Sequence, residues 1–411
     1  MLQVGERARA WCRRLTALSP RAVSLIAGLA AAMFAVVRAV RIGGAGAFVV
    51  AGSDFADRAN LPGNVPITPG AGFDGQFYYR LALDPAQVGM GRHHGIVFDY
   101  GVRGGRVAYP ALTWVGSLGG RPALVPLMLI VVNVLAVGAL GYIAAHLARD
   151  RGRAAIWGLA IAGYWGFGFV LARDLAEIVT ATGVFGALLL VSRGRYGWAS
   201  LPAALAVLSR EQAVLPVAGL IVGVLVHEWR THDGRRAVTA ASKVGALPVA
   251  VFVAWQLAVS HVIGDLPVLA GRGSNTEAPF TAWPGAMSHW WHDAVAGLSP
   301  AGGMSLGLLL PLACFVGLLV VLAGAVASGG ARSVWAQRPY ELTMVVCALA
   351  VLITATPQVL DVPADFRQFG EVVGGAWLLL WGANRPTARR WAAAAIAPLT
   401  LVVLAFRCVV V

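Results

Sequence analysis

The chain has 411 residues, of which 58% are hydrophobic and only 12% are charged, and its mean hydropathy is +0.72. This composition excludes an ordinary soluble globular protein and indicates an integral membrane protein. The formal net charge of +13 does not require a nucleic-acid partner, because a membrane topology with basic cytoplasmic loops accounts for it.

Apolar runs long enough to cross a hydrocarbon core of ~30 Å recur along the chain. Residues 1–20 form a basic leader, and the first run is too long for the apolar core of a typical signal peptide, so we expect an uncleaved first span. The clearest predicted spans are Arg21–Arg41, Ala123–Leu147, Ala154–Leu171, Leu175–Val191, Ala213–Trp229, Val238–Ile263, Ser305–Ala327, Leu342–Thr356, Phe369–Trp381 and Trp391–Phe406.

One segment is ambiguous, because Trp198–Leu208 is only half a span and Ser209-Arg210-Glu211 follows it. Either one long helix carries a buried Arg–Glu pair, or a short helix ends there and the chain turns back. The positive-inside rule favours the short helix, since eleven crossings with a cytoplasmic N-terminus put 19 of the 32 Lys and Arg residues in cytoplasmic loops. The prediction is an all-α, multi-pass plasma-membrane protein with one transmembrane domain over residues 1–411.

Two predicted external loops are long, residues 42–122 and 264–304. In the first, the apolar residues of Asp74–Pro85 recur at helical spacing, which predicts an amphipathic helix along the membrane interface. The second contains Trp283, Trp290 and Trp291, a residue type that favours the headgroup level. A pair of aromatic interfacial belts is the alternative reading of both loops.

Charged residues gather at the predicted external ends of the spans, whereas the surplus arginines gather at the other ends. Arg173/Glu177 and Arg367/Glu371 have the i,i+4 spacing of pairs that share a helix face. Ionisable groups at membrane depth are costly and are candidates for function, although ion pairs that only clamp helix ends remain an alternative. The external set comprises Asp54, Asp57, Asp74, Arg80, Arg103, Arg106, Arg173, Asp174, Glu177, Arg210, Glu211, Asp361, Asp365, Arg367 and Glu371.

Four short motifs, in order along residues 20–215, resemble the GT-C superfamily of membrane glycosyltransferases. They are Asp-Gly-Gln-Phe-Tyr-Tyr from Asp74, Arg106-x-x-Tyr109-Pro110, Arg-Asp-Leu-x-Glu from Arg173 and Ser-Arg-Glu from Ser209. The resemblance implies a polyprenyl-phosphate sugar donor, a non-cytoplasmic active face and an acidic base in the first external loop. Many members carry two neighbouring acids there. Asp54 and Asp57 are separated by two residues, which leaves open whether Asp54, Asp57 or Asp74 is the base.

The chemistry of such a transfer calls for the residue types found here. A carboxylate must take the proton of the acceptor hydroxyl, and arginines must hold the phosphate and stabilise its developing charge. We expect Asp74 to be the base, with Asp54 as the second choice. The candidate phosphate ligands are Arg106, Arg173, Arg210 and Arg367, and the candidates for orienting them or binding sugar hydroxyls are Tyr78, Asp174, Glu177, Glu211 and Glu371.

No spacing of His, Asp or Glu matches a dedicated metal site, although two aspartates and a lipid phosphate could hold Mg²⁺ or Mn²⁺. The adjacent His93 and His94 are more typical of an exposed loop than of a site. The expected partners are a polyprenyl-phosphate sugar, a glycan, lipid or protein acceptor, and membrane lipid. A transporter or flippase of a lipid-linked or anionic solute, and a non-catalytic subunit of an envelope-synthesis complex, are the alternatives.

Overall fold

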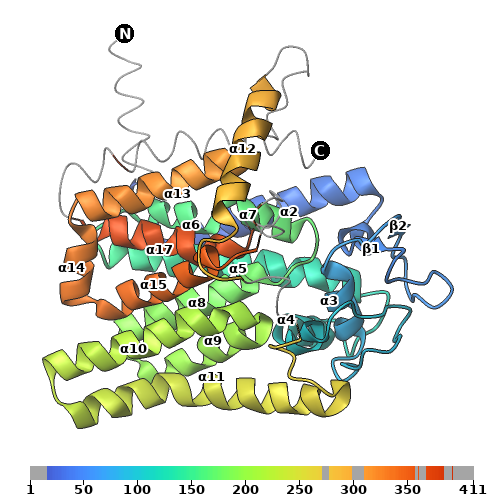
Figure 1. The fold of residues 1–411 in the computed structure, drawn as a ribbon, viewed down its shortest axis with the longest axis horizontal. Helices are drawn as coiled ribbons and strands as arrows, with labels where there is room; N and C mark the ends of the chain where they lie inside the picture. Colours follow the sequence, from blue (N-terminus) through green and yellow to red (C-terminus); the bar gives the residue numbers. More distant parts are fainter. Residues whose placement is uncertain are drawn as a thin grey trace.

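The computed structural model describes residues 16–270, 277–298, 310–356, 360, 367–383 and 391. This part of the chain is largely helical, which confirms the predicted fold class, with one short parallel strand pair, β1 (Ala51–Gly52) and β2 (Ile67–Thr68) (Figure 1). Its α-helices are α2 (Pro20–Ile42), α3 (Gly75–Leu83), α4 (Ala108–Gly116), α5 (Val125–Arg149), α6 (Leu159–Ala162), α7 (Trp165–Leu171), α8 (Glu177–Ser192), α9 (Tyr196–Ser209), α10 (Val214–Thr231), α11 (Gly234–Ile263), α12 (Trp283–Leu298), α13 (Leu310–Ala327), α14 (Gly330–Gln337), α15 (Pro339–Ile353) and α17 (Gly370–Trp381). Its 3-10 helices are η1 (Ala45–Phe48), η2 (Gly101–Gly105), η3 (Ala155–Gly158) and η4 (Glu211–Ala213).

Within the described ranges, four helices are long and apolar enough to cross a membrane: α2, α5, η4 with α10, and α11. A fifth results if α13 and α14 count as one span, although their axes differ by 67°. Helices α8, α9 and α15 are apolar but shorter. These helices support a membrane protein, whereas the count of eleven crossings remains a prediction.

The ambiguous break at Ser209 is resolved in favour of the short helix. Arg210 adopts an extended conformation, with φ −152° and ψ 136°, and ends α9. The Tyr196 hydroxyl at the start of α9 donates to Glu228 Oε1 near the end of α10, at 2.5 Å. The two helices are therefore antiparallel, and the chain turns back at Arg210.

One predicted span is wrong in detail. Ala154–Leu171 is broken into η3, α6 and α7, because Gly163 ends α6 and Tyr164 has the non-helical φ and ψ of −54° and 124°. Hydropathy alone does not distinguish such a broken segment from a continuous helix of the same composition. The last predicted span, Trp391–Phe406, lies outside the described residues except for Trp391.

The first predicted external loop folds into a compact unit at one end of the helices, where β1, β2, α3 and α4 lie together (Figure 1). The helix expected after Asp74 is present as α3, but all nine of its residues are buried. The predicted amphipathic exposure, with a polar face open to water, is therefore wrong, because the surrounding loop covers the polar face of α3 as well as its apolar face. The position of α3 relative to the membrane interface remains a prediction.

Polar residues also form a layer at the ends of the helices that lie away from β1, β2, α3 and α4. The residues predicted to be cytoplasmic meet there. The fully buried Glu341 on α15 forms an ion pair with Arg151, and Arg338 donates to the carbonyl of Asp150 at 2.8 Å. On α10, Glu228 lies 3.0 Å from Arg236 of α11. These contacts join helix ends that are far apart in the sequence.

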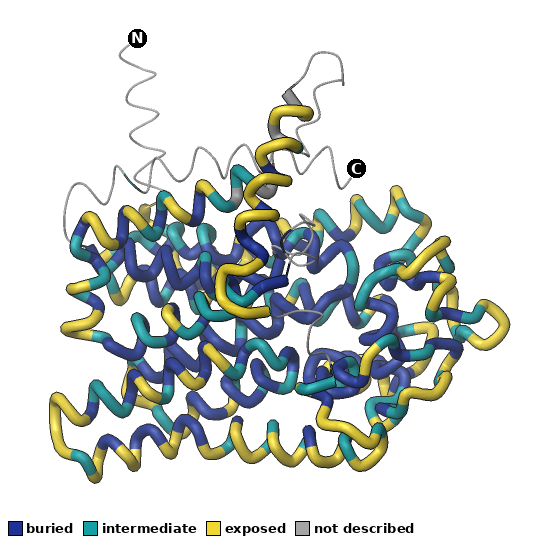
Figure 2. Tube along the Cα trace, viewed as in Figure 1, coloured by how far each residue is buried: buried dark blue, intermediate teal, exposed yellow. Residues whose placement is uncertain are grey.

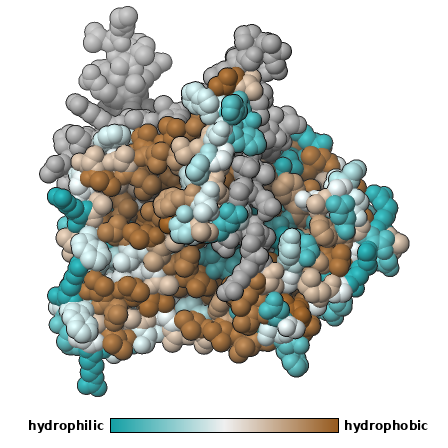
Figure 3. Space-filling model, viewed as in Figure 1, coloured by the Kyte–Doolittle hydropathy of each residue, from teal (hydrophilic) through white to brown (hydrophobic). Residues whose placement is uncertain are grey.

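Exposed residues follow the outer face of α11, while the central helices are mostly buried (Figure 2). Apolar side chains gather over the helices, and hydrophilic ones gather at both ends of the molecule (Figure 3). In the second predicted external loop, Trp290 is fully buried and donates to the carbonyl of Leu360, and only Trp291 of the three tryptophans is largely exposed. An aromatic belt therefore does not describe all three residues.

Candidate functional site

The Asp74-Gly75-Gln76 motif joins the first loop to the helix bundle. A Cβ on Gly75 would lie 2.3 Å from the carbonyl oxygen of Arg173, so only glycine allows this close approach. Gln76 accepts from the amide of Gly52 at 3.0 Å and donates to Ala71 at 2.8 Å, which holds β1 against the start of α3. Asp74 is consequently fixed beside the turn that precedes α8.

Three arginines converge on one oxygen of the Asp74 carboxylate. Oδ2 lies 2.7 Å from Arg103 Nη1, 3.2 Å from Arg106 Nη1 and 3.8 Å from Arg367 Nη2. Oδ1 makes no hydrogen bond or ion pair with the residues that the structure describes. One oxygen is thus neutralised, and the other remains available to accept a proton.

The protonation state of Asp74 follows from these contacts. Burial alone would raise the pKa of Asp74, but the positive charges of Arg103, Arg367 and Arg106 outweigh it and hold that pKa well below its ordinary value. The carboxylate is ionised at neutral pH.

Arg106 connects Asp74 to the turn at Arg210. Its side chain is 1% exposed, and it holds Glu211 bidentately at 2.9 and 2.6 Å. The aromatic residues of the two adjoining motifs lie beside it: Tyr78 meets Tyr109 edge-on at 5.5 Å, and the Tyr109 hydroxyl donates to the carbonyl of Leu129. This arrangement ties the predicted motifs of the first loop to α5.

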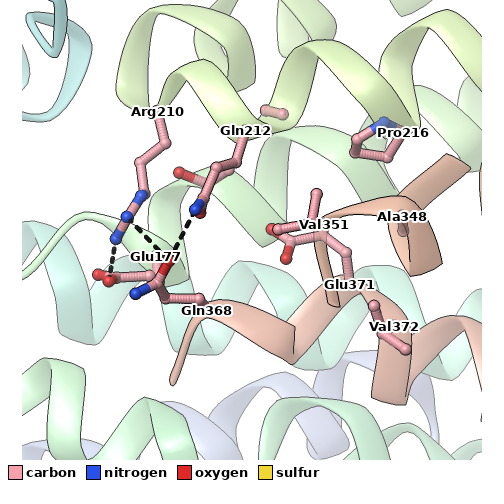
Figure 4. Close-up of a pocket in the computed structure, with 11 residues that line it drawn as sticks. Glu177, Arg210, Gln212, Pro216, Ala348, Val351, Gln368, Glu371 and Val372 are labelled. Carbon is pink, nitrogen blue, oxygen red and sulfur yellow. Dashed lines mark hydrogen bonds and ion pairs between the residues drawn. The ribbon is translucent and has the colours of Figure 1, made fainter. Parts of the chain in front are cut away.

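A second group of buried contacts lies behind the first. Glu177 Oε1 accepts from Arg367 Nε at 2.7 Å and from Arg210 Nη1, and Gln368 accepts from Gln212 at 2.7 Å. Apart from Arg367, these side chains line a cavity of about 20 Å³, into which Glu371 points (Figure 4). That volume suits one water molecule and is too small for a sugar.

The two groups form one continuous network through Arg367, which contacts both Asp74 and Glu177. In the described ranges it contains as many arginines as carboxylates, so the ionised network is neutral. Its members are Arg103, Arg106, Arg210 and Arg367 with Asp74, Asp99, Glu177 and Glu211.

Arg173 differs from the arginines of the network because no described carboxylate pairs with it. Its guanidinium lies 3.7 Å from the centre of the Phe169 ring and 4.7 Å from that of Phe73. Its Nε and Nη1 are buried without a hydrogen-bond partner in the described ranges. Burial, together with the positive charges of Arg38 and Arg367, lowers the pKa of Arg173 to about 9, so the group remains a cation at neutral pH.

Asp174, expected in the site, is instead fully buried beneath it. Its φ is +50°, and neither carboxylate oxygen has a hydrogen-bond partner among the described residues. Burial raises the pKa of Asp174 well above its ordinary value, against the attraction of Arg38. Burial therefore favours the neutral form of Asp174, and the side chain has no access to a substrate.

An apolar groove of about 450 Å³ runs between α2, α5, α6 and α7. Its lining ends at Leu171, two residues before Arg173, and the carbonyl of Ala172 accepts from Arg38 Nε at 3.2 Å. Its aromatic lining residues are Phe34, Tyr164, Trp165 and Phe167. The groove thus leads toward Arg173.

The other two candidate bases lie apart from this network. Asp57 accepts from Asn60 at 2.6 Å and lies 3.5 Å from Arg92 at an open hollow, and Asp54 is exposed beside Ser53. In the described ranges there is no group of three or more His, Cys, Asp or Glu residues that could hold a metal ion. The external residues Asp361 and Asp365 lie outside those ranges.

Helical spacing misassigned two pairs. Helix α8 begins at Glu177 and α17 begins at Gly370, so Arg173 and Arg367 precede the helices that were expected to carry them. The sequence does not predict four of the residues that contact the candidate site or lie near it, which are Asp99, Gln212, Gln368 and Arg38. No local motif identifies them, because each reaches the site through the tertiary fold.

No protein-family model, no curated protein and no solved structure matches the chain.

Proposed function

We propose that the chain is an inverting membrane glycosyltransferase that moves a sugar from a polyprenyl-phosphate donor to an envelope glycan, lipid or protein acceptor. The observation that carries this proposal is the half-buried Asp74 carboxylate, which has one oxygen bound to arginines and one unoccupied, and whose neighbour Gly75 packs against the backbone of the uncompensated Arg173. The motif resemblance to GT-C glycosyltransferases supports the same reaction class.

In the proposed step, Asp74 Oδ1 takes the proton of the acceptor hydroxyl. The acceptor oxygen forms a bond to the anomeric carbon while the bond from that carbon to the phosphate oxygen breaks, with inversion. The polyprenyl phosphate leaves with the bonding electron pair, and arginine stabilises its added negative charge.

Arg173 is the favoured phosphate ligand among the four candidates. Arg106 and Arg210 are already bound to Glu211 and Glu177, and recruiting them would leave a buried carboxylate unpaired. Arg173 has unused donors, and its stacking on Phe169 fixes the plane of its guanidinium. The apolar groove beside it suits a polyprenyl tail.

The proposed topology is eleven crossings with a cytoplasmic N-terminus in a plasma membrane. It places Asp74 and Arg173 on the outer face, away from the polar layer of Glu228 and Glu341. A donor whose headgroup lies at the outer leaflet would then reach both residues without crossing the membrane.

The test is to incubate the purified protein in liposomes with a panel of radiolabelled polyprenyl-phosphate sugars, with and without EDTA. We expect one donor to be consumed, and we expect Arg173→Gln to weaken donor binding about tenfold or more, because a charge-assisted contact is lost. Arg58→Gln is the control, since Arg58 is exposed and has no ion pair among the described residues. A wild type that binds and consumes no donor, or that moves solute across sealed vesicles instead, contradicts the proposal.

A further inference from the structure

The contacts of Arg103 distinguish it from an arginine that binds substrate. Nε and Nη2 both donate to the Asp99 carboxylate at 2.8 Å, and Nη1 lies 2.7 Å from Asp74 Oδ2. The guanidinium also lies 4.8 Å from the centre of the Phe77 ring. All three nitrogens contact carboxylates, so three of the five N–H donors of Arg103 are committed to Asp99 and Asp74.

Asp99 is held as firmly as Arg103. Its Oδ1 accepts from the amide of Tyr100 at 2.7 Å, and its side chain is 15% exposed, against 14% for Arg103. The segment that carries both residues packs against the end of α11, where Trp255 Nε1 donates to the carbonyl of Gly104 at 3.0 Å. A Cβ on Gly101 would lie 2.6 Å from Ile263, so this packing leaves little room for movement.

We infer that Asp99 and Arg103 are positioning residues that fix the Asp74 carboxylate with Oδ2 turned away from the substrate and Oδ1 turned toward it. A bidentate Arg–carboxylate pair has a defined plane, so Asp99 determines the direction of Arg103 Nη1. Arg103 in turn determines which Asp74 oxygen is neutralised. The inference rests on the proposed function, because it requires Asp74 to act as the base.

The protonation of Asp74 gives the inference a second consequence. Arg103 supplies the largest of the charge effects that lower the pKa of Asp74. Removing Arg103 raises that pKa, and a base that must be ionised is then lost at a higher pH as the solution is acidified. A residue with a purely structural role would not move this acid limb.

The experiment measures kcat, KM for the donor and the acid limb of kcat/KM for Asp99→Asn, Arg103→Gln and the double variant. We expect each single change to lower kcat by about 10- to 100-fold, because a small displacement of a reacting group has effects of this size. KM should change less than threefold, and Arg103→Gln should move the acid limb to higher pH. Arg92→Gln, which breaks an exposed ion pair on the same loop, is the control and should leave kcat, KM and the acid limb unchanged.

The double variant separates positioning from general damage. If Asp99 acts only through Arg103, adding Asp99→Asn to Arg103→Gln should cost less than twofold. The inference would be overturned if the losses in kcat of the two single variants multiplied in the double variant. An acid limb that does not move in Arg103→Gln, or an unchanged kcat in either single variant, would also overturn it. None of these results would contradict the proposed function. A wild type without transfer activity would remove the proposed function, and the inference with it.

Discussion

The pKa values of Asp74 and Asp174 are shifted in opposite directions because the surroundings of the two carboxyl groups differ. Asp74 is surrounded by arginines, which keep its pKa well below the ordinary value, whereas burial raises the pKa of Asp174 well above it. Sequence motifs place both among the candidates. The structure separates an ionised group at the site from a fully buried group beneath it whose neutral form is favoured.

The raised pKa of Asp174 predicts a pH-dependent effect of Asp174→Asn. A buried acid with a raised pKa binds its proton more tightly in the folded state, so wild-type stability falls as pH rises from about 4 toward the raised pKa. Asparagine avoids this loss and tolerates the φ of +50°. We expect the melting temperature of the variant to exceed that of the wild type at pH 8, by a smaller margin at pH 5. Equal differences at both values would contradict this.

Gly75 offers a steric test of the contact between Asp74 and the turn at Arg173. We expect Gly75→Ala to destabilise the protein by about 1–3 kcal/mol through overpacking and to lower transfer, because the new methyl group meets the carbonyl of Arg173. Gly197→Ala in α9 is the matched control. Nothing lies within 4 Å of its Cβ, so it should be neutral or stabilising in a thermal unfolding assay. Equal stability of the two variants would contradict the close approach.

At the scale of elements, Glu177 joins the start of α8 to the segment before α17 and to the turn between α9 and α10. Its carboxylate accepts from both Arg210 and Arg367. We expect Glu177→Gln to destabilise by about 3–5 kcal/mol, since it leaves buried arginine charge without a partner. Glu371→Gln should cost less, because the described residues include no ion-pair partner for Glu371. Thermal unfolding in detergent compares the two, and a larger effect at Glu371 would count against this account.

Many of the helices can be predicted from the local sequence pattern. Long apolar runs predict α2, α5 and α11 within a few residues, and the helix after Asp74 is also predicted correctly. Inside the predicted span Ala123–Leu147, Asn133 donates to the Tyr109 hydroxyl and to the carbonyl of Leu175, the kind of contact typical of a polar residue at a helix interface in a membrane. Periodicity detects which residues favour a helix, so it succeeds wherever one helix accounts for the segment.

The sequence-based predictions that the structure corrects share one physical cause. The break between α6 and α7, the complete burial of α3 and the partners of Arg173 and Arg367 depend on packing between segments distant in the chain. The sequence pattern does not identify Asp99 for the same reason, because the role of Asp99 depends on the contact between Arg103 and Asp74 across the loop. Pattern finds residues that are unusual for a membrane segment, and only the fold assigns their contacts.

At the scale of the whole molecule, the two polar ends predict opposite accessibility across a membrane. In a cysteine-free background, Ser53→Cys lies in the first predicted external loop, and Thr231→Cys lies at the end of α10, between two predicted spans. We expect a membrane-impermeant maleimide to label Ser53→Cys from the outside of intact cells and Thr231→Cys only after the membrane is opened. Labelling of both from the outside would contradict the proposed topology.

The most direct measurement of the central claim compares Asp74→Asn with Asp54→Asn and Asp57→Asn in single-turnover transfer from the donor that the wild type consumes. The account predicts that Asp74→Asn lowers the rate by about 10²–10⁴-fold, the usual contribution of a general base, in a protein that still folds and binds donor. The other two variants should retain transfer close to that of the wild type, because their carboxylates lie apart from the arginine network. Undiminished transfer by folded Asp74→Asn would contradict the account.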